Sequence, residues 1–121
     1  MERIFFIIGA FSAFIAVAAG AFGAHGLKGR LAPDMLGVFE IGVHYQMYHA
    51  IALIGVSFAI TQWPGKLVTL SGWLFGAGSL FFSGSIYLLR LTDVKLLGPI
   101  TPIGGALLLA GWLCLAIGAL K

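Results

Sequence analysis

Charged side chains are scarce in this chain: Asp, Glu, Lys and Arg together make up 9% of its 121 residues. A soluble domain carries roughly 25% charged residues, so this sequence has too little charge to cover a surface that faces water. Hydrophobic residues account for 60% of the chain. The composition therefore excludes an ordinary soluble domain and indicates a membrane protein.

Basic residues outnumber acidic ones and give a formal net charge of +3, but they do not form the continuous basic face that nucleic-acid binding requires. They stand singly between apolar runs, as membrane-flanking anchors do. The basic residues are Arg3, Lys28, Arg30, Lys66, Arg90, Lys95 and Lys121. We therefore expect no nucleic-acid partner.

The motifs of catalysis are missing as well. The single cysteine, Cys114, lies within an apolar run, so no disulfide can form within the chain. The sequence contains no nucleophile–base triad, no phosphate-binding loop and no dinucleotide fingerprint. We therefore predict a protein that is not an enzyme and carries no cofactor, with one metal-binding alternative considered below.

The chain does contain four apolar runs of a length that can cross a bilayer, for which a helix needs about 20 residues. These runs lack the alternation of polar and apolar residues that marks barrel strands. They cover residues 4–24, 43–61, 67–89 and 96–120. The first run exceeds the apolar part of a secretory signal peptide, so we expect it to be retained. The sequence predicts an all-α membrane protein, a single domain of residues 1–121 with four transmembrane helices in an antiparallel bundle.

Two segments leave alternatives open, one between spans one and two and one at the start of span four. Pro33 is tolerated in a first helical turn, and the residues after Asp34 form a broad apolar face. We expect a short interfacial helix between spans one and two, or else an extension of span two. At the start of span four, Pro99 and Pro102 would interrupt a helix. The helix proper then starts near Thr101 or Pro102, or the segment enters the bilayer partly unwound.

Four crossings would gather most polar side chains at one end of the bundle, which holds the connection between spans one and two and the connection between spans three and four. The candidate site residues there are His25, Glu40, His44, Tyr45, Gln46, His49, Tyr87, Arg90, Asp93 and Thr101. A polar side chain within the bilayer is costly without a partner, so His49 in particular suggests a functional site.

This cluster has three interpretations. The first, which we favour, is an interhelical hydrogen-bond network that holds the bundle together. The second is transfer of protons or ions through His49, Glu40 and Arg90. The third is a metal or haem site. The candidate metal ligands are His25, His44, Met47 and His49, although positions 44 and 49 lie on different faces of a helix.

Four sequence motifs, in order along nearly the whole chain, resemble a known family. They are residues 20–27 (GAFGAHGL), Tyr45-Gln46 with His49-Ala50, residues 82–87 (FSGSIY), and residues 97–105 (LGPITPIGG) with Gly111-Trp112 after them. The chain resembles the small bacterial four-span membrane proteins of domain-of-unknown-function family 423 (UPF0382 type), which are related to eukaryotic transmembrane protein 256. The resemblance implies an inner-membrane protein with four helices. It implies no substrate or catalytic role, because the family's activity is not established.

For function we expect a non-catalytic membrane component with an interhelical polar cluster at one membrane face. The alternatives are a small oligomeric transporter or channel for a proton, ion or small solute, and a metal- or haem-binding membrane protein. A continuous polar cavity past His49 would favour transport, whereas a dry, packed interior would favour the non-catalytic component. The expected partners are the lipid bilayer and, for transport, further copies of the chain; the sequence does not identify a small-molecule substrate.

The distribution of Lys and Arg predicts the orientation. The end that holds the first and third connections carries Lys28, Arg30, Arg90 and Lys95, and the other end carries Arg3, Lys66 and Lys121. By the positive-inside rule, the first end is cytoplasmic and both termini lie outside. We therefore expect a multi-pass protein of the bacterial inner (plasma) membrane in this orientation.

Overall fold

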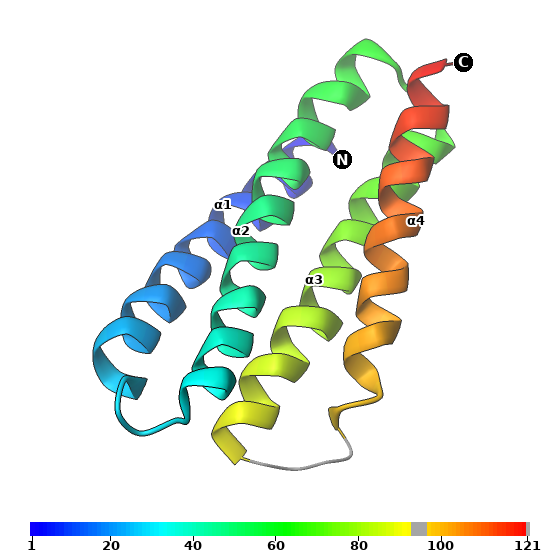
Figure 1. The fold of residues 1–121 in the computed structure, drawn as a ribbon. Helices are drawn as coiled ribbons and strands as arrows, with labels where there is room; N and C mark the ends of the chain where they lie inside the picture. Colours follow the sequence, from blue (N-terminus) through cyan, green and yellow to red (C-terminus); the bar gives the residue numbers. More distant parts are fainter. Residues whose placement is uncertain (93–96, 121) are drawn as a thin grey trace.

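A computed structural model describes residues 1–92 and 97–120, and most of these residues are helical. The elements are α1 (Glu2–Phe22), a π-helical turn η1 (Gly23–Leu27), α2 (Pro33–Gln62), α3 (Lys66–Thr92) and α4 (Ile100–Leu120). Successive helices run in opposite directions, and both chain ends lie at the same end of the bundle (Figure 1). All four helices are long and apolar enough to cross a membrane. The predicted all-α fold with four spans is confirmed.

Each helix packs against its neighbour in sequence, α1 on α2, α2 on α3 and α3 on α4. A short turn joins α2 to α3, because the Trp63 N–H donates to the Ala59 carbonyl (2.7 Å) and Pro64 cannot continue the helix. The main core contains Phe5, Phe75 and Leu53 among its fully buried side chains. Residues from all four helices contribute to this core.

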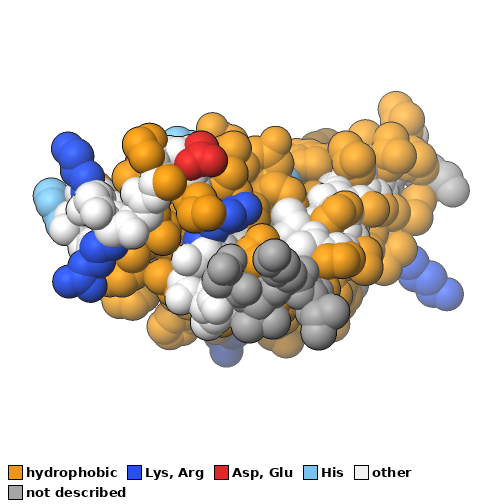
Figure 2. All heavy atoms as spheres, turned by 60° about the horizontal axis from the view of Figure 1, so that its bottom comes forward, with side chains coloured by type: hydrophobic (Ala, Val, Ile, Leu, Met, Phe, Trp, Pro, Cys, Tyr) orange, Lys and Arg blue, Asp and Glu red, His pale blue; other side chains and the backbone are white. Residues whose placement is uncertain are grey.

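The outer surface is apolar over most of its area. Phe14 is 71% exposed and Leu109 is 70% exposed, on α1 and α4 respectively. Figure 2 shows hydrophobic side chains over most of the visible face, with Lys and Arg in small separate groups. Hydrocarbon tails solvate such side chains as well as a protein interior does. The surface therefore matches the bilayer interior.

The first connection differs in part from the prediction. Residues from Pro33 onward belong to α2, so the extension of span two is present in place of a separate interfacial helix. Phe39 and Val43 on this extension pack with Leu27 of η1, which uses the apolar face that suggested an interfacial helix. Between the two elements the chain turns at Gly29, whose φ of 86° lies in the left-handed region that glycine adopts readily.

Helix α4 begins at Ile100, close to the predicted start near Thr101 or Pro102 and after the first residue of the predicted span. Pro99 precedes the helix and Pro102 lies in its first turn, where a missing N–H leaves no helical bond unmade. The Thr101 N–H donates to the Gly98 carbonyl (3.3 Å), which closes the turn before the helix. The two prolines thus set where this helix starts.

Candidate functional site

Gln46 joins three helices through one buried side chain. Its amide nitrogen on α2 donates to the Ser12 carbonyl of α1 (3.0 Å) and lies 3.3 Å from the Ser12 hydroxyl. The Tyr87 hydroxyl of α3 donates to the Gln46 amide oxygen (2.6 Å). Ser83 adds a second link between α3 and α2, because its hydroxyl donates to the Gly42 carbonyl (2.7 Å). The bonds to Ser12 and Tyr87 use the Gln46 amide as both donor and acceptor.

His49 lies one turn further along α2 and is 5% exposed. Its Nδ1 is 2.7 Å from the Tyr45 carbonyl, which can only accept, so we assign the ring proton to Nδ1. The Nε2 atom then accepts a hydrogen bond from the Trp112 indole of α4 (3.0 Å). The ring also packs against Phe75, with centroids 5.6 Å apart. Both nitrogens of a neutral His49 are therefore bonded within the bundle.

A hydrogen bond also joins α3 to α4. It lies nearer the end of the bundle that holds the α1–α2 and α3–α4 connections, which we call the connecting end. The hydroxyls of Ser85 and Thr101 are 2.5 Å apart. Tyr45 on α2 stacks its ring on Phe82 of α3 (centroids 4.7 Å) while its side chain remains 41% exposed. Each pair of packed helices is thus joined by at least one polar or aromatic contact close to the predicted cluster.

Only some of the predicted residues take part in these interhelical contacts. Gln46, Tyr87, His49 and Thr101 make interhelical hydrogen bonds, and Tyr45 contributes a backbone carbonyl and an aromatic contact. The side chains of His25, Glu40 and His44 are exposed, and Arg90 lies in the last turn of α3 with its Nε atom buried. Asp93 lies outside the described residues.

The depth of His49 also differs from the prediction. Helix α2 spans Pro33–Gln62, so His49 lies near its middle and not at the connecting end. Its partner Trp112 is likewise near the middle of α4. The buried network therefore reaches into the centre of the bundle.

The predicted metal ligands are not brought together. Within residues 1–92 and 97–120, no group of three or more His, Cys, Asp or Glu could hold a metal ion. His25 and His44 have exposed side chains, whereas His49 is buried with both ring nitrogens engaged. Met47 is half-buried on α2. The spacing of five between His44 and His49 separates their directions around the helix.

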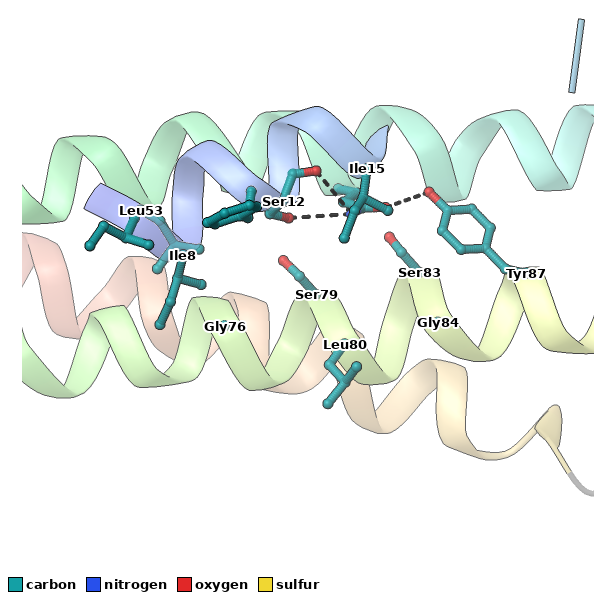
Figure 3. Close-up of a pocket in the computed structure, with 13 residues that line it drawn as sticks. Ile8, Ser12, Ile15, Leu53, Gly76, Ser79, Leu80, Ser83, Gly84 and Tyr87 are labelled. Carbon is teal, nitrogen blue, oxygen red and sulfur yellow. Dashed lines mark hydrogen bonds between the residues drawn. The ribbon is translucent and has the colours of Figure 1, made fainter. Parts of the chain in front are cut away.

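A groove of about 440 Å³ lies between α1 and α3, with α2 contributing to its floor. Its lining is largely apolar, and its polar atoms come mainly from serines, Gln46 and Tyr87. The lining residues are Ile7, Ile8, Phe11, Ser12, Ile15, Gln46, Leu53, Gly76, Ser79, Leu80, Ser83, Gly84 and Tyr87. Figure 3 shows the hydroxyls of Ser79 and Ser83 directed from α3 toward the side of the groove that carries Ser12 and Ile15.

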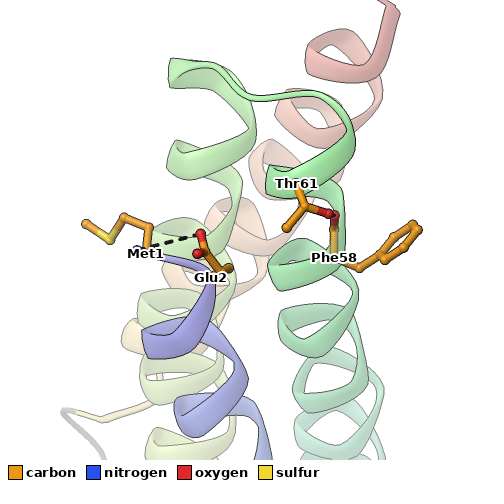
Figure 4. A network of polar contacts seen from close by, with 4 residues as sticks. All are labelled: Met1, Glu2, Phe58 and Thr61. Atoms are coloured by element: carbon orange, nitrogen blue, oxygen red, sulfur yellow. Dashed lines mark hydrogen bonds and ion pairs between the residues drawn. The ribbon is translucent and has the colours of Figure 1, made fainter.

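The end that holds the N-terminus has polar contacts of a different kind. The Met1 amino group is 4.0 Å from the Glu2 carboxylate, and the Thr61 hydroxyl donates to the Phe58 carbonyl (2.7 Å) (Figure 4). Both contacts join residues close in sequence, and their side chains are exposed. The long-range hydrogen bonds described above lie elsewhere, along the central and connecting parts of the helices.

Sequence reasoning missed Ser12 and Ser83 as hydrogen-bonding partners, together with the role of Trp112. A tryptophan deep within a span is a usable signal, because its indole N–H requires an acceptor where the bilayer excludes water. Ser79 and Ser83, four residues apart, share one face of α3, which is consistent with helix packing as well as with a polar groove wall.

Four long antiparallel helices, an apolar exterior and buried interhelical hydrogen bonds define a multi-pass α-helical membrane protein. The chain belongs to the family described as "Protein of unknown function (DUF423)", whose model matches residues 19–105.

Curated relatives cover almost the whole chain. The UPF0382 membrane protein SAB0533 of Staphylococcus aureus is 48% identical over 98% of this chain and 97% of its own. The UPF0382 membrane protein SH2409 of Staphylococcus haemolyticus is 47% identical over the same shares. The UPF0382 membrane protein YwdK of Bacillus subtilis is 44% identical over 98% of each chain. No solved structure matches the chain.

Proposed function

We propose that the protein is a non-catalytic membrane component whose buried polar side chains hold its four helices in one arrangement. The observation that carries this proposal is the state of His49. A histidine that relays protons or binds a metal needs a ring nitrogen that an incoming group can reach. Here Nδ1 is bonded to the Tyr45 carbonyl, Nε2 is bonded to Trp112, and the side chain is 5% exposed.

The surroundings of this network support the same proposal. The rings of Phe75 and Trp112 pack against His49 and against each other, with 4.7 Å between the centroids of that pair. Gln46 uses its amide oxygen for Tyr87 and its amide nitrogen for Ser12. Satisfied polar groups of this kind fix helix positions. Helices fixed in this way, with both ring nitrogens of His49 engaged, are what we expect of a structural component rather than of a solute path.

Reconstitution into liposomes tests this proposal. With a pH-sensitive dye inside the vesicles and an imposed potassium diffusion potential, we expect proton flux equal to that of protein-free vesicles. His49→Ala should give the same trace, because no transfer step depends on the ring. Flux above the protein-free level that is lost in His49→Ala would overturn the proposal. It would support the alternative, an oligomeric transporter of protons or ions.

We infer that the protein resides in the bacterial inner (plasma) membrane, with the end that holds residues 28–32 in the cytoplasm. The relatives come from bacteria, and this end carries the larger number of Lys and Arg in the sequence. Alkaline phosphatase fused after Lys121 should then be active, and a fusion within residues 28–32 should be inactive. The reverse pattern would invert the orientation.

A further inference from the structure

The groove between α1 and α3 contains a polar atom that the bundle does not use. Ser79 is 8% exposed, and among the described residues its hydroxyl oxygen has no hydrogen-bond partner. Other buried serines have partners: Ser83 donates to Gly42 of α2, and Ser71 donates to the Val68 carbonyl of its own helix (2.6 Å). A buried unpaired hydroxyl is costly, so a ligand that supplies an acceptor there gains affinity.

The depth of Ser79 limits which molecules can supply that acceptor. Ser79 is 13 residues from each end of α3, which spans Lys66–Thr92, so it lies near the centre of the bilayer. The ester oxygens of a phospholipid lie at the edge of the hydrocarbon core, about 15 Å away. A charged group at this depth is strongly disfavoured. The remaining class is a neutral lipid that carries a carbonyl oxygen on an apolar body.

We propose that this groove binds a lipid quinone, with a ring carbonyl oxygen accepting a hydrogen bond from the Ser79 hydroxyl. The volume of about 440 Å³ falls in the range of small-molecule sites. Apolar side chains such as Phe11 and Leu80 line the groove and suit the ring and alkyl tail. The assignment rests on the proposed non-catalytic role, because the ligand is held and not converted.

Gly76 provides a way to fill the groove without disturbing the bundle. It lines the groove, and a Cβ added there would meet no atom within 4 Å. Gly76→Leu therefore places a side chain in the proposed binding space. Gly55→Leu is the matched control, because a Cβ there also meets nothing within 4 Å and this exposed glycine on α2 is not part of the groove. Ser79→Ala removes the donor and keeps the shape.

The test is photolabelling of the purified protein in lipid nanodiscs with a decyl benzoquinone that carries a diazirine on its tail. Labelling should be saturable, map to peptides of α1 and α3, and be displaced by unlabelled decylubiquinone. Gly76→Leu should abolish it and Gly55→Leu should leave it unchanged. Ser79→Ala should raise the concentration of decylubiquinone needed for displacement about fivefold, the effect of one hydrogen bond. Decylbenzene lacks carbonyl oxygens, so it should displace the label only weakly, and equally so from the parent protein and from Ser79→Ala.

Two outcomes would overturn the quinone assignment. If Gly76→Leu is labelled like the parent, the groove is not the site. If decylbenzene competes as well as decylubiquinone and Ser79→Ala has no effect, the groove holds only the acyl chains of ordinary lipids. Neither outcome bears on the absence of proton flux proposed above. Conversely, flux dependent on His49 with intact labelling would overturn the non-catalytic role and leave the binding site standing.

Discussion

Gly104→Leu is expected to destabilise the bundle by about 3 kcal/mol, because it forces apart two helices whose backbones touch. A Cβ at Gly104 would lie 2.8 Å from the Cα atom of Phe82 and 2.9 Å from the Gly78 carbonyl oxygen, both on α3. These are backbone atoms and cannot rotate away as the end of a long side chain can. The α3–α4 pair must therefore separate along its length, with loss of the Ser85–Thr101 hydrogen bond.

Unfolding in mixed micelles of increasing SDS fraction, followed by tryptophan fluorescence, measures this loss. Gly55→Leu is again the control, and we expect it to change stability by less than about 0.5 kcal/mol because a Cβ there meets no atom within 4 Å. Equal unfolding curves for the two variants would mean that α3 and α4 do not approach each other closely at Gly104.

The number and approximate limits of the helices could be predicted, because a bilayer fixes the length of apolar sequence that a span requires. The start of α2 could not. Residues 33–42 include Asp34 and Glu40, so the apolar run begins at Val43, whereas the helix begins at Pro33. With a start at Val43, His49 is assigned to the end of the bundle that holds the first connection, whereas it lies near the middle of the observed α2.

Only some members of the hydrogen-bond network could be predicted from the sequence. Gln46, Tyr87 and His49 stood out because polar side chains within a span require partners. Their partners Ser12 and Trp112 depend on how each helix is rotated and on which helices are adjacent. In a soluble helix the polar face reveals the rotation, but a helix in lipid is apolar on its inner and outer faces alike. The sequence therefore carries little information about which faces meet.

His49→Ala is expected to destabilise the bundle by about 1–2 kcal/mol, the upper part of the range for interhelical polar contacts in membranes. The substitution removes the acceptor of the Trp112 indole N–H at a depth where no water replaces it. It also leaves a space beside Phe75, whose ring packs on the imidazole. The same SDS titration would measure the change in the free energy of unfolding.

A second variant separates the hydrogen bond from the packing. Trp112→Phe keeps an aromatic ring near Phe75 but removes the indole donor and part of the ring area, so it should cost about 0.5–1 kcal/mol. The double variant should lose about 0.6 kcal/mol less unfolding free energy than the sum of the two single losses, because each single substitution already breaks the same bond. Strict additivity would mean that His49 stabilises the bundle through packing alone. In that case the ring nitrogen Nε2 would be free for other chemistry, which would weaken the case for a non-catalytic component.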